Sequence, residues 1–60
     1  MIRIGQFDAD ELKLMKADDS LQTLIKSKRV ELCFQGYDCG EVWVRSEDGE
    51  AFEQASRYVQ

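Results

Sequence analysis

The strongest constraint on this fold is a pair of apolar–polar alternations that flank a glycine-bracketed turn. A period of two is typical of strands that bury one face, so residues 30–35 and 41–45 are predicted to form an antiparallel hairpin. Residues 36–40, between them, begin and end with glycine and have the composition of a turn. The alternating apolar residues are Val30, Leu32 and Phe34 before the turn and Val42 and Val44 after it.

We expect Phe34 to pair with Val42, because that register puts every apolar side chain of the hairpin on one face. A slip by one residue would turn the two valines to the opposite face. The only tryptophan, Trp43, then points away from the core side. The remaining expected pairs are Leu32 with Val44 on the core face, and Glu31 with Arg45, Cys33 with Trp43 and Gln35 with Glu41 on the other.

The chain has 60 residues, enough for one small domain spanning 1–60. A domain of this size buries only about 60% of the surface that its unfolded chain exposes, so it commonly depends on disulfides, metal ions or association. With two cysteines and no histidine, association is the favoured aid. We therefore expect a homodimer or a partner-bound chain.

The two cysteines are expected to be reduced, because Cys33 lies in a predicted strand and Cys39 in the turn, where a bridge is geometrically awkward. The sequence shows no basic-then-apolar leader, and no apolar run approaches the roughly 20 residues that span a bilayer. These features predict a cytoplasmic protein that does not engage membranes.

Three helical segments are predicted, at about 9–17, 20–28 and 49–59. The first has the clearest start, since Asp8 and Glu11 form a capping box and Phe7 and Leu12 a hydrophobic staple. One long helix over 9–28 is an alternative, and a strand at 12–14 paired with residues 2–6 is another. The second segment has a weaker cap signal at Asp19. One apolar stripe would run through Leu14, Ala17, Leu21, Leu24 and Ile25.

An alternation at Ile2 and Ile4 adds a short N-terminal strand. The predicted fold is therefore a small α+β layer structure in the order β-α-β-β-α, with the helical region between the first two strands kinked. The apolar hairpin face is expected to pack on the helices that carry Leu21, Leu24, Ile25 and Phe52.

We expect no catalytic residues, no metal site and no cofactor. Without histidine the chain lacks the commonest general base and the commonest zinc ligand. The acidic run from Asp8 to Glu11 does not fit a calcium-binding loop, because the sixth position is Lys13 where that loop needs glycine. Helix capping explains these acids instead.

The distribution of charge argues against a nucleic-acid partner. The net charge is −4, and residues 30–60 carry seven acidic against two basic side chains. Binding to nucleic acid rests on neutralising phosphates, whereas an acidic surface suits a basic protein partner.

Trp43 is the residue that most suggests a function. If one face of the sheet is uncovered, Trp43 and Cys33 form an apolar spot there, extended by Tyr37 in the loop, and such spots often anchor interfaces. The alternative is that a helix covers each face and buries Trp43 in a second small core.

We therefore predict a non-enzymatic protein-binding module that acts sterically on a protein partner, such as a basic, nucleic-acid-binding host protein. Its size and acidity are typical of small inhibitors and regulators, including viral proteins of phages and products of other mobile elements. The predicted partner-binding residues are Trp43, Cys33, Tyr37, Glu41, Glu47, Asp48, Glu50 and Glu53.

Two other functions remain open at this point. A small nucleic-acid-binding regulator would use the basic residues Lys26, Lys28 and Arg29. Helix-dipole complementation explains the same three residues without any ligand. A structural subunit that folds only within a larger assembly is the second alternative.

Overall fold

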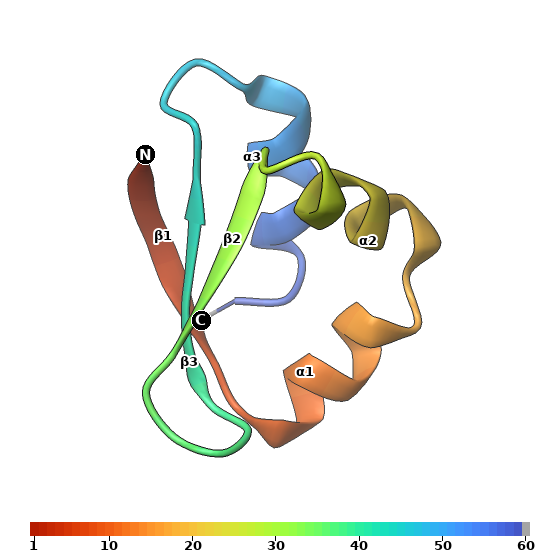
Figure 1. The fold of residues 1–60 in the computed structure, drawn as a ribbon, viewed down its shortest axis with the longest axis vertical. Helices are drawn as coiled ribbons and strands as arrows, with labels where there is room; N and C mark the ends of the chain where they lie inside the picture. The colour runs from red at the N-terminus through yellow and green to blue at the C-terminus, as the bar shows by residue number, and fades with distance from the viewer. Residues whose placement is uncertain (60) are drawn as a thin grey trace.

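The computed structural model describes residues 1–59 and confirms the α+β class. These residues form an antiparallel sheet in the order β1-β3-β2, with three helices (Figure 1). The first helical region, expected to be kinked, is interrupted at residues 17–18, so it contains two separate helices. Along the chain the elements are β1 (Ile2–Phe7), α1 (Ala9–Lys16), α2 (Asp19–Lys26), β2 (Val30–Phe34), β3 (Gly40–Val44) and α3 (Gly49–Ser56).

All three helices pack on the same face of the sheet, so the domain has two layers and one core (Figure 1). The central strand β3 lies between β1 and β2, and its even-numbered residues face the helices. The fully or nearly buried core consists of Phe7, Leu12, Met15, Leu21, Leu24, Val30, Val42, Val44, Ala51 and Ala55.

The hairpin register differs from the predicted one by two residues. Leu32 pairs with Val42, Val30 with Val44, and Phe34 with Gly40. A shift of two residues preserves the faces, so the prediction of which side chains share a face holds while the predicted partners are wrong.

The geometry of the hairpin loop explains this shift. The carbonyl of Cys39 accepts hydrogen bonds from the backbone N–H groups of Gln35 and Gly36, at 2.9 and 3.2 Å, so the loop closes at Cys39, two residues before Glu41, the predicted partner of Gln35. Gly40 then belongs to β3 rather than to the turn. A Cβ atom at Gly40 would lie 2.1 Å from the Cys33 carbonyl oxygen, so the strand needs glycine there.

Strand β1 pairs with β3 through a β-bulge at Ile4. Arg3 pairs with Trp43 and Gly5 with Val42, which leaves Ile4 as an extra residue packed against the core. A bulge of this kind changes which residues face which side. As a result Phe7 reaches the core, while Arg3 stays on the opposite face.

The helix starts follow local capping chemistry. The capping box of Asp8 and Glu11 on α1 is confirmed. Helix α2 begins at Asp19, and its N-cap is Asp18 rather than Asp19, with the Asp18 carboxylate accepting from Leu21 N at 3.1 Å. The other carboxylate oxygen of Asp18 accepts a 2.5 Å hydrogen bond from the Tyr58 hydroxyl, which ties the segment after α3 to the α1–α2 junction.

Two details of the expected helix faces are wrong. Helix α1 buries Leu12 and Met15, whereas Leu14 is 59% exposed, because the break between α1 and α2 disrupts the single stripe assumed for them. Helix α3 buries Ala51 and Ala55, and Phe52 is 49% exposed. Small alanines let α3 lie close to the sheet, and the larger side chain turns outward.

Helix α2 ends in a Schellman motif with lysine where glycine is usual. Lys28 N donates to Ile25 O at 3.1 Å and Arg29 N to Leu24 O at 2.9 Å. Lys28 therefore has a φ of 66°. This left-handed turn stops the helix two residues before the predicted end at 28.

Replacing Lys28 by glycine removes the steric cost of its left-handed backbone. We expect Lys28→Gly to raise the free energy of unfolding by about 0.5–1 kcal/mol, since glycine accepts this conformation without a Cβ clash. Urea unfolding followed by circular dichroism measures the change.

Ser27→Gly is the matched control, because Ser27 has a φ of −86° and donates its hydroxyl to Leu24 O. We expect this variant to be less stable than the parent. A Lys28→Gly variant that is also destabilised would contradict the assigned backbone conformation.

Candidate protein-binding surface

Trp43 lies on the face of the sheet that the helices of residues 1–59 leave uncovered, here called the open face. Its direct cross-strand neighbours are Arg3 on β1 and Glu31 on β2. The alternative in which a helix covers each face is wrong, because the buried helix residues all belong to one core on the other side. Trp43 is nevertheless half-buried, as expected for a central residue with neighbours standing on both flanking strands.

The open face also carries an ion pair and a free thiol. Arg3 Nε lies 2.5 Å from Glu41 Oε2 and donates a hydrogen bond to it. Cys33 is the direct partner of Glu41 in the sheet, and its thiol is free and exposed. Three of the predicted binding residues, Trp43, Cys33 and Glu41, are therefore brought together on one surface.

Tyr37 lies elsewhere, at the tip of the hairpin loop, where it is 99% exposed. Trp43 is three residues into β3 from the loop end, which corresponds to roughly 10 Å of strand. The aromatic residue closest to the loop on the sheet is Phe34, whose ring contacts that of Phe7 edge to face with centroids 5.4 Å apart. Tyr37 therefore does not extend the Trp43 spot directly.

The predicted acidic cluster divides into two residues that are free of Arg29 and two that contact it, of which Glu50 keeps a side chain that is 69% exposed. Glu47 and Glu53 are exposed, and Glu53 lies 3.8 Å from Arg57. Asp48 and Glu50 both bind Arg29. The cluster belongs to α3 and the turn before it, and α3 lies in the helix layer, on the opposite side of the sheet from Trp43.

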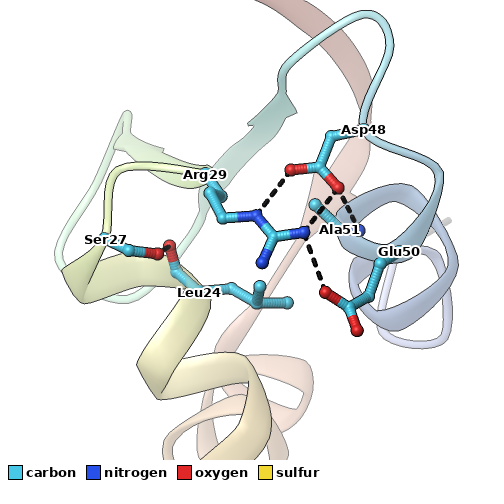
Figure 2. Close-up of polar contacts among 6 residues, drawn as sticks. All are labelled: Leu24, Ser27, Arg29, Asp48, Glu50 and Ala51. Atoms are coloured by element: carbon cyan, nitrogen blue, oxygen red, sulfur yellow. Dashed lines mark hydrogen bonds and ion pairs between the residues drawn. The ribbon is translucent and has the colours of Figure 1, made fainter.

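Figure 2 shows how Arg29, the residue that directly precedes β2, contacts Asp48 and Glu50 at the start of α3. Its Nε and Nη2 atoms donate to the two carboxylate oxygens of Asp48 at 2.7 and 2.8 Å, and Nη2 donates to Glu50 at 2.8 Å. Asp48 is also the N-cap of α3, accepting from Ala51 N at 3.1 Å. The bidentate Arg29 contact and the cap bond together lower the pKa of Asp48 to about 2.

This arrangement bears directly on the basic residues considered for nucleic-acid contact. Lys26 and Lys28 are exposed, whereas Arg29 is half-buried and occupied by two carboxylates. The three side chains therefore do not form a cluster of three free cations. The helix-dipole explanation accounts for Lys26, which lies in the last turn of α2.

Within residues 1–59 no group of three or more cysteine, aspartate or glutamate side chains is placed to hold a metal ion. No helix in the described part of the chain combines the length and the apolar character needed to cross a bilayer. Comparisons with protein families, curated proteins and solved structures found no match to this chain.

Sequence reasoning missed Arg3 as a member of the open face and Arg29 as a structural residue. Arg3 reaches the face because β1 pairs with β3 through a bulge, and no local pattern marks that pairing. The structural role of Arg29 could have been suspected from the sequence, because an arginine directly before a strand can pair with acidic residues at the start of a helix elsewhere in the chain. Without the fold, however, the position of Arg29 does not show which acidic residues it binds.

The contact between Arg29 and Asp48 makes stability depend on pH. The folded pKa of Asp48, about 2, lies below its ordinary value of 3.8, so the contribution is complete above pH 4 and is lost as the pH falls towards 2. Asn is also a good N-cap, so Asp48→Asn removes the ion pair and keeps the cap. The stability advantage of the parent over this variant should shrink between pH 4 and pH 2 in urea-unfolding series.

Arg29→Met supplies the control background. With the guanidinium removed, Asp48→Asn should change the pH dependence of unfolding much less than it does in the parent. An equal effect in both backgrounds would show that Arg29 does not set the pKa of Asp48.

Proposed function

We propose that the protein is a non-enzymatic protein-binding module that docks on its partner through the open face, with Trp43 at the centre. The observation that carries this proposal is an uncovered sheet face bearing the only tryptophan of the chain. Tryptophan is among the side chains that contribute most to binding energy at protein interfaces. A half-buried indole held between two strands also loses little conformational freedom on binding.

The charges around Trp43 favour a partner with basic groups near its docking site. Glu31 and Glu41 lie on the open face, and Arg3 already binds Glu41. Glu31 has no ion pair within 4.0 Å among the described residues. A cationic side chain of the partner would therefore pair with Glu31 beside the indole.

The acidic residues of α3 have a different role in this proposal. Glu53 lies on α3 and Glu47 in the turn before it, both away from Trp43. In this proposal they act through the net charge of −4 rather than by contact. Long-range attraction of this kind speeds association with a basic partner and weakens with salt. Asp48 and Glu50 serve the fold through Arg29.

We further propose that the module is an inhibitor or regulator that works by covering part of a cytoplasmic protein. A basic, nucleic-acid-binding host protein is the partner class that fits its charge, and a phage or other mobile element is the kind of source in which such small acidic regulators are frequent. Size and charge support this part of the proposal.

The nucleic-acid alternative is distinguishable by its salt dependence. Because Arg29 is engaged in the fold, we expect any retention on DNA or RNA to show a slope of log affinity against log salt near zero. Fluorescence anisotropy with labelled duplex and single-stranded probes measures it. A slope of several units that Lys26→Ala reduces would favour the nucleic-acid function instead.

Capture with matched variants tests the docking proposal. Immobilised parent protein should retain a partner that Trp43→Ala fails to retain, while Phe52→Ala, which removes an exposed aromatic residue of α3, should behave as the parent does. Loss of a central tryptophan typically costs about 2 kcal/mol or more, which is roughly a 30-fold loss of affinity. Circular dichroism checks that both variants are folded.

Charge reversals then separate contact from long-range attraction. Glu31→Lys should slow association and speed dissociation of the captured partner, whereas Glu53→Lys should mainly slow association. A partner that binds Trp43→Ala as tightly as the parent would show that the open face is not the docking surface.

A further inference from the structure

An open groove of about 680 Å³ lies between the end of α2, strand β2 and Trp43 of β3. Its apolar lining includes Ile25, Leu32 and Phe34, and the ring of Phe34 is 49% exposed. Val30 also lines the groove but is 0% exposed, so the backbone at the start of β2 is closed to a further strand. A ligand in this groove therefore contacts side chains and does not extend the sheet.

Two charged residues, Lys28 and Glu31, line the same groove. Both are exposed, and neither has an ion pair within 4.0 Å among residues 1–59. Glu31 is the strand partner of Trp43 on the open face, whereas Lys28 lies in the turn that ends α2, in the helix layer. The groove thus places one unpaired cation and one unpaired carboxylate, from two different layers, beside a single apolar surface.

Lys28 occupies a backbone position that suits glycine better. Its φ of 66° is left-handed, and this conformation is unfavourable for a residue with a Cβ atom. The Schellman ending of α2 needs the conformation but not the ammonium group, which makes no ion pair among the described residues. Strain at a residue whose side chain does not stabilise the fold points to a role in binding.

We propose that the docking segment of the partner protein carries a carboxylate beside a large apolar side chain, and that Lys28 binds the carboxylate while the groove receives the apolar group. This inference rests on the proposed function, because it extends the contact at Trp43 around β2. Charge complementarity supports it, since a cation of the partner pairs with Glu31 and a carboxylate with Lys28. Lys28 also repels a uniformly basic protein, which gives the surface selectivity among basic partners.

An amphipathic anion tests the groove without the partner. The probe 8-anilinonaphthalene-1-sulfonate has an aromatic body and one negative charge, and Trp43, the only tryptophan, transfers excitation energy to it when it binds nearby. We expect saturable binding to the parent and a dissociation constant about three- to fivefold higher for Lys28→Gly, the contribution of one exposed ion pair. Because Lys28→Gly is the more stable protein, unfolding does not explain weaker binding.

The controls keep the charge or remove it elsewhere. Lys28→Arg keeps the cation and should retain the parent's affinity, and Lys26→Ala removes the same charge from a residue outside the groove and should change it little. Phe34→Ala should weaken probe binding, whereas Phe52→Ala, which removes an equally exposed ring from α3, should not. A parent without saturable energy transfer overturns the proposal, as does Lys28→Gly that binds as tightly as the parent.

Binding to the captured partner separates this inference from the docking proposal. Lys28→Gly should weaken that binding about three- to fivefold, and Lys28→Glu should weaken it further. A partner that is lost on Trp43→Ala but binds Lys28→Gly as tightly as the parent overturns the Lys28 contact alone. A partner that Lys28→Gly weakens and Trp43→Ala leaves unaffected overturns docking through the open face alone.

Discussion

The three helices, of eight residues each, cover only one face of the sheet, and this limit determines which surfaces of the described chain stay exposed. Packed side by side on one face of the sheet, they build a single core, and the described chain has no element left to cover the other face. Val42 and Val44 are consequently fully buried while Trp43, between them in sequence, is not. The open face is a direct result of this arrangement of the described elements.

With so small a core, the helix caps also hold the layers together. Asp18 starts α2 and binds Tyr58, 40 residues later, and Asp48 starts α3 and binds Arg29, 19 residues earlier. Hydrogen bonding to the Tyr58 hydroxyl lowers the pKa of Asp18 and raises that of Tyr58. Each carboxylate satisfies a local need of the backbone and a distant side chain at once. Some of the carboxylates that the sequence offers for partner binding are therefore already engaged in contacts within the fold.

Structural features that neighbouring residues determine are predicted correctly from the sequence, whereas features that distant elements determine are not. The capping box at Asp8, the hairpin and its two faces follow from neighbouring residues, so they are correctly predicted. The partners within the hairpin are wrong because loop closure by Cys39 O and the space at Gly40 outweigh apolar pairing. The exposure of Leu14 and Phe52 depends on how each helix meets the sheet. The place of Arg3 on the open face depends on a bulge in β1 and on the pairing of β1 with the distant strand β3, where Arg3 is opposite Trp43.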